Sequence, residues 1–189
     1  MTFMKKCVTA AAVAAVLGGA PTLAHALTSA NEPVTSVAAA SATSTSAKAV
    51  ARTVAVGERV QIAPKAELWL TKDGKHWSTP DNTDQFRSVV DGNIDMHHGS
   101  VSLQAEPAGD SYLLTGVYVA KGAASVKVQT EKGTVTGSIV QLAGANNWGA
   151  WYATAPLPDK AMSKQKQNYI RSVSVYDAGG NVLVTFSMK

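Results

Sequence analysis

Apolar and polar side chains alternate in short stretches through the C-terminal two thirds of the chain. Leu68 and Leu70, for example, stand on either side of Trp69 and face away from it. Successive side chains of a β-strand point to opposite faces, so this alternation indicates strands with one buried face. The same alternation, or a longer apolar run, occurs at 101–105, 111–119, 126–129, 134–142, 170–175 and 182–188.

Turn sequences separate these stretches. Lys72-Asp73-Gly74-Lys75, Glu131-Lys132-Gly133 and Asp177-Ala178-Gly179-Gly180-Asn181 carry residues that accept a positive φ at low cost. Short strands at roughly 8–12-residue spacing predict an all-β fold, an antiparallel β-sandwich or a barrel. The last two stretches, 169–188, look like the closing hairpin of an immunoglobulin-like sandwich. Only 82–90 and 160–167 have any helical character.

The N-terminus has the pattern of a secretory signal peptide. Lys5 and Lys6 precede an apolar stretch from Val8 to Leu17, and Ala24 and Ala26 place small residues where signal peptidase cleaves. About 10 apolar residues are too few for a membrane span, which needs roughly 20. We therefore expect residues 1–26 to be a signal peptide, with no membrane span after cleavage and a secreted or extracellular product.

A stretch rich in small polar residues follows the expected cleavage site. From 27 to 52, 17 of 26 residues are Ala, Ser or Thr, and none is aromatic. Such a composition buries too little apolar surface to order itself, so it predicts a flexible linker. The single β-rich domain is then expected over residues 53–189.

Cysteine and charge exclude several functions. Cys7 is the only cysteine and lies in the signal peptide, so the mature domain is expected to be disulfide-free and without thiolate chemistry. Loss of Lys5 and Lys6 leaves 15 basic against 13 acidic residues. A balance this close to neutral, without a basic face, argues against nucleic acid as a partner.

Three segments carry a resemblance to a known group of proteins. They are Leu68–Trp77, Leu142–Tyr152 and Ser174–Asn181. Together they resemble small secreted proteins of filamentous actinobacteria, a group with no assigned function. The resemblance covers the whole expected domain and implies secretion and a β-rich fold. It implies no catalytic residue.

The histidines are the most chemical-looking side chains. On a strand, Asp95 and His97 would share a face and begin a metal site, with His76 and His98 as further ligands. A metal site needs three or four ligands, and the mature chain offers few. We therefore favour an exposed polar loop, expect no metal and no cofactor, and keep a small extracellular hydrolase or metal protein using His76, His97 and His98 as the alternative function.

Aromatic side chains concentrate between 146 and 152. Asn146 and Asn147 precede Trp148 and Trp151, and Trp69 lies opposite two leucines on its own strand. We favour core packing for these tryptophans, with an exposed platform for ligand binding as the alternative. Without a catalytic motif, the sequence predicts a secreted, non-enzymatic binding module for an extracellular protein or a cell-wall glycan. Its candidate ligand-binding residues are Trp69, Asn146, Asn147, Trp148 and Trp151.

Overall fold

The computed structural model describes residues 50–145, 147–158 and 169–188. The chain divides into two units, Met1–Ser44 and Thr45–Lys189, and all described residues belong to the second. The expected signal peptide, residues 27–49 of the expected linker and the stretch 160–167 lie outside the described residues.

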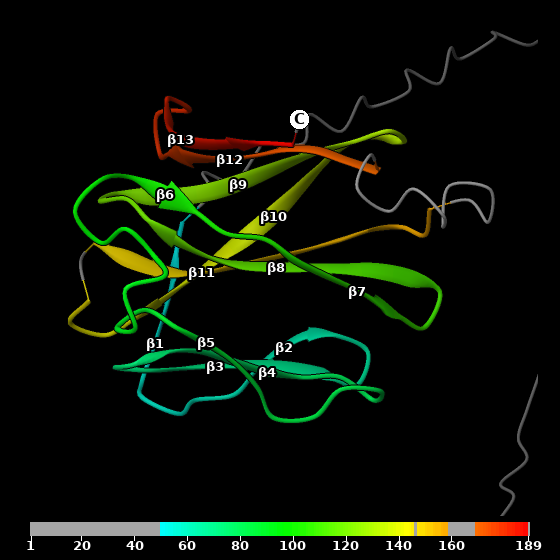
Figure 1. The fold of residues 1–189 in the computed structure, drawn as a ribbon, viewed down its shortest axis with the longest axis horizontal. Helices are drawn as coiled ribbons and strands as arrows, with labels where there is room; N and C mark the ends of the chain where they lie inside the picture. The colour runs from blue at the N-terminus through cyan, green and yellow to red at the C-terminus, as the bar shows by residue number, and fades with distance from the viewer. Residues whose placement is uncertain (1–49, 146, 159–168, 189) are drawn as a thin grey trace, which may run out of the picture. The chain divides into compact units, whose positions relative to one another are not determined.

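The fold of the described residues is all-β, as the alternation predicts (Figure 1). The strands are β1 (Arg52–Val54), β2 (Val60–Ala63), β3 (Ala66–Thr71), β4 (Gly74–Ser78), β5 (Gln85–Ser88), β6 (Ser100–Val101), β7 (Gln104–Ala108), β8 (Ser111–Val119), β9 (Ala123–Thr130), β10 (Gly133–Leu142), β11 (Trp148–Pro156), β12 (Ile170–Asp177) and β13 (Val182–Ser187).

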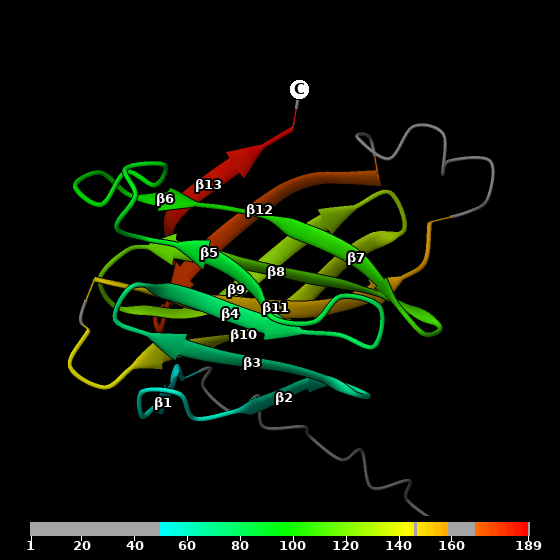
Figure 2. The same cartoon turned by 60° about the horizontal axis from the view of Figure 1, so that its bottom comes forward.

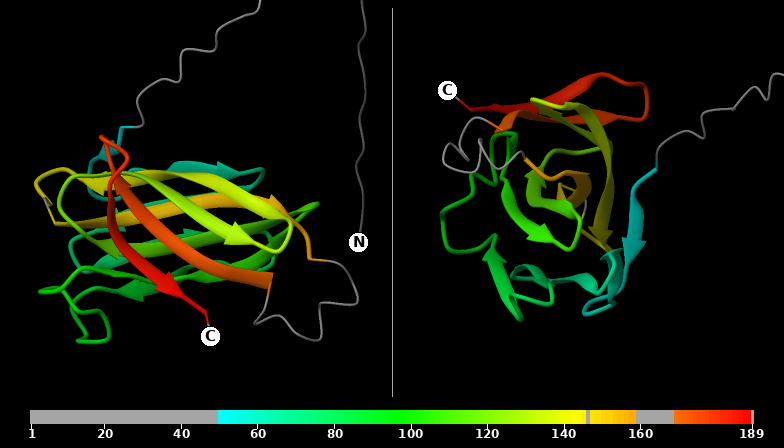
Figure 3. Two further views of the ribbon diagram at one scale, coloured as in Figure 1. Left: turned by 90° about the horizontal axis from the view of Figure 1, so that it is seen from above. Right: turned by 90° about the vertical axis from the view of Figure 1, so that its right-hand side faces the viewer.

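Nine strands form one strongly curled sheet. Its order is β13-β12-β9-β10-β11-β8-β6, with β7 paired to β8 and β1 paired in parallel to β10. The sheet nearly closes into a barrel, seen end-on in the right panel of Figure 3, because its two end strands, β6 and β13, lie close to each other. The second sheet, β2-β3-β4-β5, packs against the outside of this barrel (Figure 2). Sandwich and barrel are thus both present.

The sequence of strand β8 is mostly apolar because both of its faces are covered. Leu113 and Val117 point into the layer between the two sheets, where they pack with the side chains of β3 and β4. Leu114 and Tyr118 point into the barrel. The polar Thr115 is also buried, and its hydroxyl accepts a hydrogen bond from Lys75.

Gly116 makes room for the largest side chain inside the barrel. A Cβ at this position would overlap the Trp151 indole and the Ser102 carbonyl. With glycine there, the Trp151 Nε1–H reaches the Ser102 carbonyl oxygen at 3.1 Å, and Trp151 is fully buried. The interruption of the apolar run by glycine is therefore a packing requirement.

Several local predictions can be compared with these strands. The C-terminal hairpin is confirmed as β12 paired with β13. The stretch 82–90 is not helical, since it contains β5, and the expected strand 101–105 is divided between β6 and β7. Lys75, assigned to a turn from its neighbours Asp73 and Gly74, lies in β4 and is buried.

Candidate functional site

Both tryptophans of the 146–152 stretch are core residues. Trp151 is fully buried inside the barrel, and Trp148 is 7% exposed in the layer between the sheets. The alternative of an exposed aromatic platform is wrong here, because β11 is covered on both faces. Asn147 is exposed at the start of β11, whereas Asn146 lies outside the described residues.

Trp69 lies on the outer face of the four-stranded sheet, as its position opposite Leu68 and Leu70 predicts. Strand register places it directly across from His76, and places His76 across from Phe86. We call Trp69, His76 and Phe86 the outer row. Ring centroids are 5.3 Å apart between Trp69 and His76, and 4.5 Å apart between His76 and Phe86.

The two ends of the outer row differ: the Arg59 guanidinium covers Trp69 at one end, and Phe86 is exposed at the other. The Arg59 guanidinium lies 3.4 Å from the centre of the Trp69 ring, and this cover leaves Trp69 only 9% exposed. Glu67 holds the guanidinium from the side at 3.4 Å. At the other end, Phe86 is 47% exposed on a short strand at the edge of its sheet.

The stacking decides which ring surfaces a ligand can meet. The Trp69 and His76 planes are inclined by only 12°, so each of these rings has one face against the other. Arg59 also lies over the Trp69 ring, and Phe86 packs against His76 with a 35° tilt between the ring planes. A ligand approaching the sheet therefore meets ring edges, the guanidinium and the exposed side of Phe86.

His76 is kept in its neutral form within this row. Partial burial lowers the pKa of the imidazole, and the positive charge of Arg59 lowers it further, against a smaller opposite effect from Asp73 and Asp84. The Thr71 hydroxyl lies 3.2 Å from Nε2. A neutral imidazole packs against Arg59 and Trp69 without charge repulsion, so the row is intact at neutral pH.

Beneath the same sheet, a buried lysine points toward the barrel. Lys75 is fully buried, and its ammonium group donates to Gln104 Oε1 at 2.9 Å and to Thr115 Oγ1 at 2.6 Å. It also lies 3.8 Å from the centre of the Trp77 ring. Burial lowers the pKa of Lys75 well below its usual value; Glu106 opposes the shift, and Arg87 adds to it. The one sequence pattern that bears on this arrangement is the spacing of Lys75 and Trp77, which places both on the same face of their strand.

The Glu106 carboxylate accepts hydrogen bonds from three side chains in the layer between the sheets. The donors are Trp77 Nε1 at 2.6 Å, Asn82 Nδ2 at 2.7 Å and Thr79 Oγ1 at 3.3 Å. These contacts join β4 and the segment after it to β7 of the barrel. These hydrogen bonds therefore hold the four-stranded sheet in place against the barrel.

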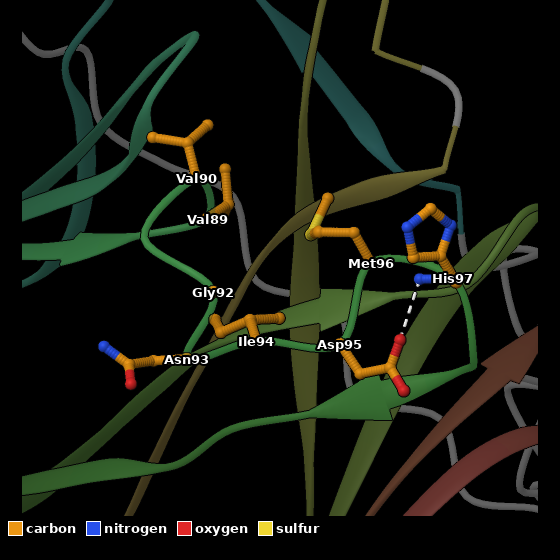
Figure 4. Close-up of a pocket in the computed structure, with 8 residues that line it drawn as sticks. All are labelled: Val89, Val90, Gly92, Asn93, Ile94, Asp95, Met96 and His97. Carbon is orange, nitrogen blue, oxygen red and sulfur yellow. Dashed lines mark hydrogen bonds between the residues drawn. The ribbon is translucent and has the colours of Figure 1, made fainter.

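The loop between β5 and β6 encloses a hollow of about 710 Å³ (Figure 4). Asp95 does not share a strand face with His97: it accepts from the backbone N–H groups of His97 and His98 at 2.9 and 3.0 Å. Figure 4 shows the His97 imidazole pointing away from that carboxylate. The hydrogen bonds hold the pKa of Asp95 far below its usual value.

Asp95, His97 and His98 are all exposed, so the prediction of an exposed polar loop is confirmed.

The histidines do not assemble into a metal centre within the described part of the chain. His98 pairs with Asp95 at 2.8 Å between Nδ1 and the carboxylate, whereas His76 belongs to the outer row. Across residues 50–145, 147–158 and 169–188, no three His, Cys, Asp or Glu side chains lie close enough to hold a metal ion. The metal-binding form of the alternative function therefore has no geometric support in these residues.

The described residues also contain no helix long and apolar enough to cross a membrane. Comparisons with protein-family models, with curated proteins and with solved structures give no match to this chain.

Proposed function

We propose that the protein is an exported, non-enzymatic binding module that recognises an extracellular protein through the outer row and Arg59. The observation that carries the proposal is Phe86, which is 47% exposed at the open end of a stacked aromatic row. Exposed apolar surface that is contiguous and bordered by polar groups marks interaction sites, and the outer row combines Phe86 with Arg59 at its opposite end. Tryptophan and arginine are also the residue types that dominate binding energy at protein interfaces.

The stacking favours a protein over a glycan as the partner. Sugar rings bind aromatic side chains through the flat ring face, and in the outer row those faces are occupied by neighbours. The surface that remains consists of ring edges, the exposed Phe86 and the Arg59 guanidinium, which is paired with Glu67. Such a mixture of apolar and polar groups is typical of surfaces that bind folded proteins. A cell-wall glycan is the competing ligand, and it forms the second arm of the experiment.

The test uses two exposed phenylalanines as a matched pair. Phe86 is 47% exposed on the outer row, and Phe186 is 40% exposed on β13 of the other sheet. A photoreactive phenylalanine analogue is placed at either position, and the protein is exposed to the proteins of the culture medium and, separately, to cell-wall glycan. We expect a discrete protein adduct from position 86 alone, and its loss in Arg59→Ala. Equal labelling from both positions, or labelling of glycan alone, contradicts the proposal.

Export is part of the same proposal and has its own support. It rests on Lys5 and Lys6, on the short apolar stretch after them and on the small residues before position 27. Intact-mass measurement of protein recovered from the medium should give a chain that begins near Leu27. A recovered mass that includes Met1 contradicts export by a cleaved signal peptide, and it leaves the outer row untouched as a binding surface.

A further inference from the structure

A second hollow, of about 370 Å³, lies where three connections meet at one end of the sheets. Its walls come from Val56 between β1 and β2, from Lys72 between β3 and β4, and from the turn between β10 and β11. None of these residues belongs to the outer row. The volume falls within the range of small-ligand pockets, about 300–1,000 Å³.

The floor and walls of this hollow are apolar. Trp148 and Leu142 are only 7% and 5% exposed and form part of the core beneath. Val56, by contrast, is 59% exposed and leaves apolar surface in contact with water. Between them, the small side chain of Ala143 and the bare Gly144 leave the space open, and a Cβ at Gly144 would meet no atom within 4 Å.

One charged side chain lines the hollow. It is Lys72, and no acidic residue is among the lining residues. Within the described residues Lys72 forms no ion pair. The hollow thus joins an apolar floor to a single ammonium group, which is the arrangement that orients a ligand with an apolar body and one negative end.

We propose that this hollow binds a small apolar ligand that carries one carboxylate, such as a medium-chain fatty acid. The alkyl part lies against Trp148, Leu142 and Val56, and the carboxylate lies at Lys72. The inference rests on different residues from the proposed partner surface, so that either can fail without the other. It also gives Trp148 a part in ligand binding through its exposed edge, although the rest of its side chain is core.

The experiment compares three probes of equal chain length with the full chain in its exported form. Decanoate, decanol and decylamine are titrated by calorimetry below their aggregation concentrations. We expect decanoate to bind about fivefold more tightly than decanol, and decylamine to bind least, because a single partly exposed ion pair adds that order of affinity. Added salt should weaken decanoate alone, since it screens the charge contact. Equal affinity of decanoate and decanol overturns the proposal.

Three variants separate the charge from the apolar floor. Lys72→Met should bring decanoate to the affinity of decanol, and Ala143→Trp should abolish binding of both by filling the space. Lys121→Met removes an exposed lysine that does not line the hollow, and should leave both affinities unchanged. Urea midpoints equal to the parent's show that each variant is folded. If Lys72→Met and Lys121→Met bind decanoate alike, or if no probe binds, the proposal is wrong.

Discussion

The interior of the barrel and the layer between the two sheets are both buried, but they differ in charge. Inside the barrel the hydrophobic cluster contains no charged side chain, and the Tyr118 hydroxyl is kept neutral because burial raises its pKa. The layer between the sheets holds Lys75, which is hydrogen-bonded to Gln104 and Thr115, with the Glu106 carboxylate nearby. The barrel should therefore respond to lost volume, and the layer to lost partners and to pH.

The largest effect is expected inside the barrel. Trp151→Ala removes a fully buried indole and its hydrogen bond to the Ser102 carbonyl, leaving a cavity between β8 and β11. The free energy of unfolding should fall by about 3–5 kcal/mol. Urea unfolding measures it, and a loss below about 1 kcal/mol would mean that the barrel wall collapses around the missing ring.

The pH dependence of stability should come from the layer between the sheets. The pKa of Lys75 is lowered in the folded state, so between that pKa and about 10.5 the unfolded chain binds one more proton than the folded chain. Stability then rises with pH across this window, by up to about 1.4 kcal/mol per pH unit, and falls on acidification.

Lys75→Met should flatten that dependence in the pH range below about 10.5, because only a lysine whose pKa is lowered in the folded state makes the unfolded chain bind the extra proton. Unfolding by urea at several pH values measures the slope. Lys121→Met, which removes an exposed lysine, serves as the control and should keep the parent slope. Parallel slopes in all three proteins would show that Lys75 is charged in the folded state.

A smaller effect is expected where Glu106 joins the two sheets. Trp77→Phe removes the N–H that donates to the Glu106 carboxylate at 2.6 Å and keeps most of the ring volume. We expect a loss of about 1.5 kcal/mol, typical of a hydrogen bond to a charged group. A double-mutant cycle with Glu106→Gln isolates the pair, and additive losses would show that the two side chains do not interact.

The smallest change in stability is expected on the outer row. Phe86→Ala alters an exposed side chain at a sheet edge, so its unfolding free energy should stay within about 0.5 kcal/mol of the parent. The same variant, added as a competitor, should fail to suppress the protein adduct formed by the photoreactive analogue at position 86, whereas the parent protein should suppress it. If Phe86→Ala unfolds at a clearly lower temperature than the parent, the main role of Phe86 is to pack against His76.

The sequence alone predicts the strands in which apolar and polar residues alternate, because this alternation shows which side chains point to the buried face and which to the exposed face. It places Trp69 on the outer face, and it predicts the hairpin of β12 and β13. It misplaces Lys75, since a lysine after Asp73 and Gly74 has the local pattern of an exposed turn. The partners that accept its protons come from β7 and β8, far along the chain, and no local pattern contains them.

The outer row could not be predicted from the sequence either, because its members come from strands that no local pattern joins. His76 and Trp69 lie in one hairpin, but Arg59 and Phe86 are brought to them by β2 and β5, two short strands without a clear alternation. The burial of Trp148 depends on the second sheet covering the first, and the burial of Trp151 depends on the first sheet curling into a barrel. The long apolar run of β8 was the one sign in the sequence that both faces of the barrel wall are covered.

The parallel pairing of β1 with β10 has a consequence for the order in which the chain folds. Arg52 pairs with Val140, and Val54 with Leu142, so the first strand has no hydrogen-bonding neighbour until the tenth has formed. Contacts between segments this distant in sequence close late, because a long loop loses entropy before any bond rewards it. A chain that emerges with its N-terminus first therefore keeps β1 without its pairing partner until β10 has emerged.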